Sequence, residues 1–160
     1  MGVSHFLPLR TELREWSDRK QEVSTPLFSG YLFVRMNPAT ESRLPILKIP
    51  GVAGFVGNNT GPLPIPNQQI EDIQTVLSEQ VAYELVPALQ EGDLVRVVRG
   101  VLTGVEGKLI RMNSSMRLVI SVEMIHQALA VSVSRGDVVP AAFPVAREPE
   151  FHQSQSTALN

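Results

Sequence analysis

The sequence predicts an α+β domain followed by a small all-β barrel, and three observations support this fold class. Residues 1–80 mix short apolar runs with helical patterns, without a regular alternation of strand and helix. After residue 91 the hydrophobic pattern has a period of two almost throughout, as in half-buried strands. The length of 160 residues accommodates two small domains. We therefore expect an antiparallel sheet with helices in residues 1–80, and a barrel in residues 91–140.

Strands are predicted near the start of the first domain. The apolar runs at residues 6–9 and 31–36 are rich in branched and aromatic side chains, and polar turns flank both. The polar stretch 13–25 lies between them and predicts a long hairpin tip. A third run at residues 52–57 predicts another strand of the same sheet.

Two helices are predicted in the same domain. Ser42 can cap a short helix in which Pro45 falls within the first turn, where a missing N–H costs little. Asn67 can cap a longer amphipathic helix with Glu71 and Asp72 in its first turn, where the helix dipole favours anions. The apolar residues of that helix fall on one stripe, which we expect to cover the sheet.

The remainder of the chain predicts a linker, a barrel and a tail. Pro87 opposes continuation of the helix, so residues 81–90 are interpreted as a linker. His126 is interpreted as a turn residue between two strands. The tail, residues 141–160, is polar and unpatterned and is expected to be disordered. About five strands in about 50 residues protect their edges best by closing into a barrel; they are predicted at residues 94–98, 107–112, 116–124, 128–134 and 138–140.

Composition argues against several classes of function. The 14 Lys and Arg against 16 Asp and Glu leave a net charge of −2, unlike a polycation that coats nucleic acid. Without Cys the chain has no disulfide, thiolate nucleophile or cysteine metal site, and the three His lack metal-ligand spacing. We therefore expect no enzymatic activity, no cofactor and no metal. No run approaches the roughly 20 apolar residues of a membrane span, so a cytoplasmic location without membrane contact is expected.

The segment GDLVRVVRGVLTGVEGKLIRM, residues 92–112, resembles the KOW motif. This motif occurs in SH3-like barrels of NusG transcription factors and of some ribosomal proteins. Gly107 permits a positive φ or a close backbone approach between strands, and the loop from Gly100 to Glu106 is expected to project from the rim. A Gly-rich loop in an unrelated small barrel is the alternative.

A second segment resembles the core of the NusG N-terminal domain. TPLFSGYLFVRMNP at residues 25–38 is followed by IPGVAGFVG at 49–57 and then by a helix, in the order and spacing of that family. HFLPLRTELREWSDR at residues 5–19 resembles specialised paralogues of the UpxY and RfaH type. The family normally begins with a Trp-Tyr strand and a basic helix, which are expected to be missing here. Unpaired strand edges would then favour pairing with another chain.

The resemblance implies a transcription elongation regulator, specifically an antiterminator, that performs no reaction itself. Its N-terminal domain is expected to bind the paired clamp helices of RNA polymerase. Tyr31 and Phe33 match contact aromatics of the family and, two apart on a strand, are expected to point the same way. Core packing of Phe33, and simple helix capping by Ser42, are the alternatives. The full set implied for polymerase binding is Tyr31, Phe33, Leu27, Phe28, Ser42 and Arg43.

Two further surfaces follow from the resemblance. The basic residues of the hairpin tip would contact upstream or non-template DNA, unless they are merely solvated among the interleaved acids; they are Arg10, Arg14, Arg19 and Lys20. The barrel loop would bind ribosomal protein S10 or the termination factor Rho, with Leu102 and Val105 as exposed apolar contacts. The residues implied there are Gly92, Asp93, Gly100, Leu102, Gly104, Val105 and Gly107. An RNA-binding KOW module associated with the ribosome or translation is the alternative function.

Overall fold

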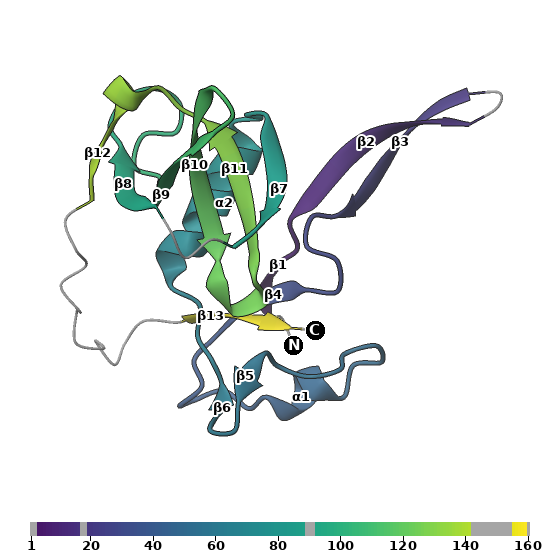
Figure 1. Ribbon diagram of the computed structural model, residues 1–160. Helices are drawn as coiled ribbons and strands as arrows, with labels where there is room; N and C mark the ends of the chain where they lie inside the picture. Colours follow the sequence, from purple (N-terminus) through teal and green to yellow (C-terminus); the bar gives the residue numbers. More distant parts are fainter. Residues whose placement is uncertain (1–2, 17–18, 89–91, 142–154, 160) are drawn as a thin grey trace.

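The computed structural model describes residues 3–16, 19–88, 92–141 and 155–159 (Figure 1). These parts of the chain are mostly β-strand. They also contain the short helix α1 (Leu44–Leu47), the longer helix α2 (Asn67–Ser78) and two single-turn 3-10 helices, η1 (Glu123–Ile125) and η2 (Arg135–Asp137). The mixed α+β region followed by an all-β region agrees with the order that the sequence predicts.

Six antiparallel strands form the large sheet, in the order β12-β8-β9-β10-β11-β7. Period-two alternation predicts most of these strands. β11 is nevertheless buried on both faces, because Leu129 and Val131 join the main core cluster while Ala128 and Ala130 join a separate one. Five lie within two residues of the predicted strands, and this arrangement is compatible with the predicted barrel. The bounds are β7 (Tyr83–Pro87), β8 (Asp93–Val97), β9 (Glu106–Met112), β10 (Ser115–Val122), β11 (Gln127–Ser132) and β12 (Val138–Pro140).

The sixth strand, β7, corrects the expectation of a linker at residues 81–90. Tyr83–Pro87 pairs with β11 over five residues, from Tyr83 opposite Val131 to Pro87 opposite Gln127. Pro87 is accommodated at the last position of an edge strand, where the lack of an N–H matters least. Residues 89–90 lie outside the described residues.

The small sheet has the order β1-β4-β13 and brings together distant parts of the chain. β1 (Ser4–Phe6) and β13 (Gln155–Leu159) each pair antiparallel with the central strand β4 (Leu32–Met36). The expectation of disorder in the tail is therefore wrong for 155–159, while 142–154 and 160 lie outside the described residues. The expected unpaired edge is also absent at β4, which has a strand partner on both sides.

Two hairpins complete the β-structure. β2 (Leu9–Trp16) and β3 (Arg19–Pro26) pair along their whole length and project from the rest of the molecule (Figure 1). Most of the stretch 13–25, which the sequence predicts as a hairpin tip, is therefore paired β-strand. β5 (Gly57–Asn58) and β6 (Gly61–Pro62) form a two-residue hairpin. The strand predicted at 52–57 is mostly wrong: within it, only the isolated bridge at Phe55 and Gly57, the first residue of β5, have strand structure. Gly51 turns the backbone just before this stretch with a φ of 92°.

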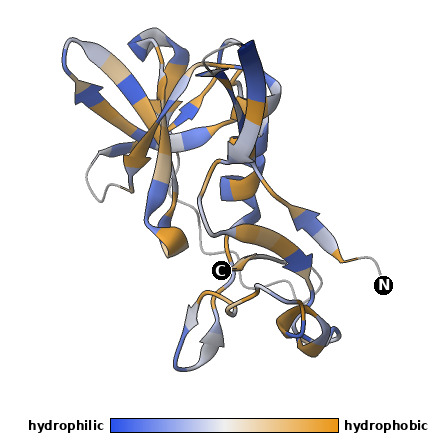
Figure 2. Cartoon of the chain, turned by 90° about the vertical axis from the view of Figure 1, so that its right-hand side faces the viewer, coloured by the Kyte–Doolittle hydropathy of each residue, from blue (hydrophilic) through white to orange (hydrophobic). Residues whose placement is uncertain are grey.

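Helix α2 lies against strands β9 and β10 of the large sheet. Its stripe of Ile70, Ile73 and Val76 is fully buried in a core cluster that also contains Phe33 and Leu118. Hydrophobic and polar residues are interspersed along the strands of the large sheet (Figure 2). Residues of the two predicted domains therefore contribute to one apolar core. That the two regions fold independently of each other stays a prediction.

The helix starts differ slightly from the predicted caps. Asn67 is the first residue of α2, and Pro66 occupies the cap position without a side-chain hydrogen bond. Arg43 caps α1, although Ser42 still contributes because its Oγ accepts the N–H of Leu44 at 3.3 Å. Pro45 lies in the first turn of α1, as predicted.

Candidate functional site

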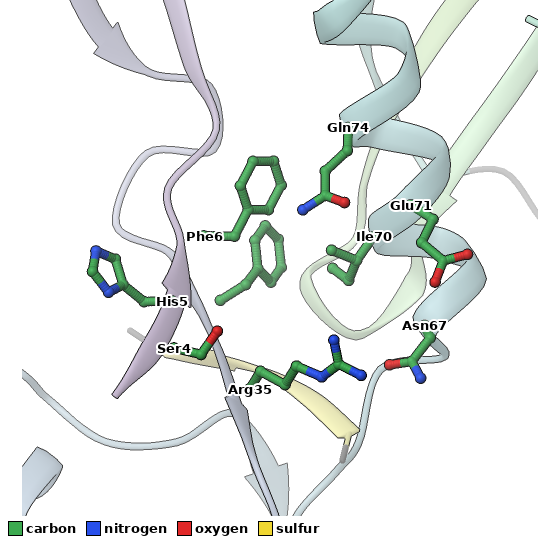
Figure 3. Close-up of a pocket in the computed structure, with 9 residues that line it drawn as sticks. Ser4, His5, Phe6, Arg35, Asn67, Ile70, Glu71 and Gln74 are labelled. Carbon is green, nitrogen blue, oxygen red and sulfur yellow. The ribbon is translucent and has the colours of Figure 1, made fainter. Parts of the chain in front are cut away.

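A cavity of about 150 Å³ opens between strands β1 and β4 and helix α2 (Figure 3). Aromatic and aliphatic side chains form its floor, and polar groups surround them. Arg35 extends from β4 toward Asn67 and Glu71 on α2, whereas the His5 imidazole points away from the cavity (Figure 3). Such a combination suits an apolar anchor held in place by polar contacts. The lining residues are Ser4, His5, Phe6, Phe33, Arg35, Asn67, Ile70, Glu71 and Gln74.

Packed aromatic rings make the floor of this cavity rigid. Phe33 stacks on Phe6 at a centroid distance of 6.0 Å and an interplanar angle of 23°. Phe28 meets Phe33 edge-on at 6.0 Å and 84°. Both arrangements are favourable for aromatic pairs. Because Phe33, Phe28 and Leu27 are all buried, they build the core beneath the surface, in agreement with the core alternative for Phe33.

Tyr31 lies in a different depression from Phe33. It is half-buried just before β4 and lines a groove of about 330 Å³ with Leu7, Leu32 and Leu159. Its N–H donates to the carbonyl oxygen of Phe28 at 3.1 Å, which closes a turn and orients the residue. The structure therefore does not bring the two aromatics to one opening, although both contact the main core cluster.

Exposed apolar side chains lie on and just after the short helix α1, which precedes part of the groove lining in the chain. Leu44 and Leu47 belong to α1, and Ile49 follows it. Pro50, Gly51 and Val52 continue the chain from there into the lining of the Tyr31 groove. Ser42 and Arg43 are exposed at the start of α1. We call this region, Tyr31 with Leu44, Leu47 and Ile49, the apolar face.

Asp72 is a buried carboxyl group, whereas the sequence predicts for it only a helix-dipole interaction. Burial raises its pKa from 3.8 to about 7, while hydrogen bonds from Gln68 and from the backbone of Glu106 oppose that rise. The Gln68 Nε2 donates to the carboxylate at 2.8 Å. The nearby charges of Glu106 and Glu71 raise the pKa further. The sequence signal for the burial of Asp72 is its position beside Ile73, on the apolar stripe of the helix.

The basic residues of the β2–β3 hairpin are partly paired with acids. Arg10 lies 2.8 Å from Glu12, and Lys20 lies 2.7 Å from Glu15. The Lys20–Glu15 pair is solvent-exposed and the Arg10–Glu12 pair is partly exposed, so each pair contributes little to stability. Arg14 and Arg19 are exposed on the same hairpin. This arrangement is compatible with the solvated-tip alternative, and DNA contact stays a prediction.

The loop from Gly100 to Gly107 departs from the expected exposure. Leu102 is 6% exposed and Val105 only 1%, so the prediction that they are exposed contacts is wrong. The Gly104 N–H donates to the Val97 carbonyl oxygen at 2.9 Å, which folds the loop back and turns both side chains inward. Val101, at 63%, is the exposed apolar residue of this loop.

The glycines of the KOW-like segment have distinct roles. Gly107 lies in β9, where an added Cβ would come within 2.6 Å of the Val119 carbonyl oxygen, so the expected close approach is confirmed. Gly100 and Gly104 adopt φ values of 87° and 94°, which glycine accommodates without strain. Gly92 also has a positive φ and precedes Asp93, the exposed first residue of β8.

Two observations bear on other classes of site. Among the described residues, no group of three or more His, Asp or Glu could hold a metal ion. In the same part of the chain, no helix is long and apolar enough to cross a membrane.

Comparison with known proteins gives consistent matches. The family model “Transcription termination factor nusG” matches residues 1–74. The “Transcription termination/antitermination protein NusG” of Lactococcus lactis is 32% identical over 130 residues, which cover 79% of this chain and 69% of the relative. The protein of that name from Thermus thermophilus is 34% identical over 110 residues, 64% of this chain and 59% of its own length. Since these matches reach from the small sheet into the large one, the chain belongs to the NusG family.

Proposed function

We propose that this protein is a non-enzymatic transcription elongation regulator, an antiterminator that binds RNA polymerase through residues 1–80. The observation that carries this proposal is the 32% identity over 130 residues to a relative named for transcription termination and antitermination. The chain spans 59% to 69% of the length of the two relatives described above, so the activity of the whole relative is part of the proposal.

The apolar face is the surface that we assign to the clamp helices of the polymerase. Tyr31 offers a half-buried ring with a polar tip, and such aromatic groups are frequent anchors of protein interfaces. Leu44, Leu47 and Ile49 are each more than 40% exposed within six residues of the chain, and they lead into the groove lining at Pro50–Val52. Exposed apolar groups close together in the chain favour a protein partner. A helix that lays its own apolar stripe in such a groove would desolvate both surfaces.

A binding assay with a clamp-helix fragment of RNA polymerase tests this assignment. We expect Tyr31→Ala to weaken binding at least tenfold, because the ring supplies an anchor at the edge of the groove. Tyr31→Phe retains the ring and should bind nearly as well as the natural chain. Leu13→Ala is the matched control, since Leu13 is exposed on the distant β2–β3 hairpin.

Two results would reject the assignment. One is that the natural chain, shown to be folded by circular dichroism, does not bind the clamp-helix fragment. The other is that Tyr31→Ala and Leu13→Ala bind equally well.

The KOW-like part would bind a second protein, with ribosomal protein S10 and Rho as the candidates implied by the family. Val101 is the exposed apolar side chain of the loop, and a neighbouring groove of about 320 Å³ is lined by Val97, Met116 and Val133. We expect Val101→Glu to abolish binding of the correct candidate, because a charge replaces the apolar contact. Equal binding of the natural and variant chains to both candidates would refute this surface.

The charge distribution does not favour RNA binding as the main activity. Residues 91–140 carry six Lys and Arg against five Asp and Glu. One of the six, Arg96, is already bound to Glu106 through its guanidinium group. Phosphate binding depends on an excess of positive charge, which this region lacks.

A further inference from the structure

The strand β13 occupies an internal position in the fold although it comes from the end of the described chain. It pairs with β4 over five residues, from Gln155 opposite Met36 to Leu159 opposite Leu32. On its other side, Leu159 forms a bridge with Phe55, and the Val56 N–H donates to the Ala158 carbonyl oxygen at 3.1 Å. β13 therefore fills a slot between β4 and the Phe55–Val56 segment (Figure 1).

The side chains at the end of β13 complete two apolar clusters. Ala158 is 0% exposed and belongs to the main core cluster with Phe33. Leu159 is 3% exposed and packs in a second cluster with Val34, Met36 and Ile46. An empty slot would expose both clusters and leave the β4 edge unpaired, which is a recognised template for strand addition.

The contacts of β13 are with β4, α2 and the Phe55–Val56 segment, while the preceding strand β12 pairs with β8 in the large sheet. Thirteen residues, 142–154, connect Ala141 to Gln155. Fully extended, a connection of this length spans about 45 Å. Because the contacts of β13 are made by residues 155–159 themselves, an identical strand from a second copy can make the same contacts.

We propose that this slot is a strand-acceptor site that takes the Gln155–Leu159 strand of a second copy of the chain. The product is a strand-exchanged dimer in which each copy completes the small sheet of the other. A second copy is the fitting donor because it carries the same uncharged segment. This segment also has a small residue, Ala158, at a position that is completely buried in the slot. Since a short connector gives an effective concentration of about millimolar, the exchanged form grows as the protein concentration rises.

Disulfide trapping between full-length chains tests the exchange, because the chain has no Cys of its own. Ser156 lies opposite Arg35 in the β13–β4 ladder. Antiparallel partners are about 4.5–5.5 Å apart at Cα, which permits a disulfide. The variants Arg35→Cys and Ser156→Cys are mixed at high concentration under mild oxidation, and the mixed dimer is quantified by mass. The control mixture is Ser78→Cys with Ser156→Cys, since Ser78 is exposed at the end of α2.

We expect at least five times more mixed dimer from the first mixture than from the control. Equal yields would overturn the proposal, because they would reflect random collision. A synthetic peptide of residues 151–160 in excess should reduce the mixed dimer at least fivefold, and the same peptide with Ala158→Glu should leave it unchanged. If neither peptide reduces the mixed dimer, the slot is not the acceptor and the proposal fails. None of these outcomes depends on polymerase binding.

Discussion

The large and small sheets of this protein are built in opposite ways. The strands of the large sheet follow one another along residues 83–140, and most of them pair with sequence neighbours. The small sheet joins residues 4–6, 32–36 and 155–159, so its pairing spans nearly the whole chain. Local pairing needs little loop closure, whereas long-range pairing must offset a larger entropy cost. The small sheet therefore depends on a few well-placed buried residues.

The variant Ala158→Glu, in the small sheet, is expected to cause the largest loss of stability. A carboxylate would replace a methyl group that is completely buried, with no basic partner among the cluster residues. We expect the free energy of unfolding to fall by about 3–5 kcal/mol. Urea denaturation followed by circular dichroism measures it. A loss below about 1 kcal/mol would show that β13 contributes little to the native fold.

In the large sheet, Leu102→Ala removes a buried side chain from the loop between β8 and β9. The expected loss is about 3 kcal/mol, because truncation leaves a cavity in the core. Val101→Ala, next to it in sequence but exposed, should change stability by less than about 0.5 kcal/mol. The same denaturation experiment compares the two. Similar losses for both would contradict the inward turn of the loop.

Gly107→Ala tests whether the close strand approach limits the large sheet. An added Cβ would lie 2.6 Å from a backbone oxygen of β10, which cannot move without disturbing the ladder. We expect a loss of about 2 kcal/mol from this overpacking. The matched control is Gly136→Ala, where no atom lies within 4 Å of the added carbon. A neutral Gly107→Ala variant in thermal unfolding would argue against the tight approach of β9 and β10.

Asp72→Asn tests the buried carboxyl group at the contact between α2 and the large sheet. Because the folded-state pKa is raised, to about 7, the stability contributed by protonated Asp72 is fully present below pH 3.8 and is lost as pH rises through 7. Asparagine does not ionise, so the variant should be more stable than the natural chain at pH 8, by about 2 kcal/mol. The difference should decrease toward pH 4. Urea denaturation at both pH values measures this difference, and the prediction is wrong if it does not depend on pH.

The candidate site was only partly predictable from the sequence. Tyr31 emerged from the family resemblance, and its position beside an exposed groove is compatible with the predicted role. Leu102 and Val105 were assigned the wrong exposure, because a Gly-rich loop pattern does not reveal whether the loop folds back onto the core. Asp72 was interpreted as a helix-dipole residue, since the partner that buries it lies more than 30 positions away in the chain.

Local sequence patterns were sufficient to predict most helices and strands and the order of the two regions. The period-two alternation of residues 116–134 predicted strands, and the spacing of Ile70, Ile73 and Val76 predicted an amphipathic helix. These patterns state which face of an element is buried but not what covers it. Two contacts are seen only in the folded molecule: α2 covers the large sheet, and β13 lies between β4 and Phe55. The physical reason is that such contacts join distant residues, and their free energy comes from packing that no local pattern records.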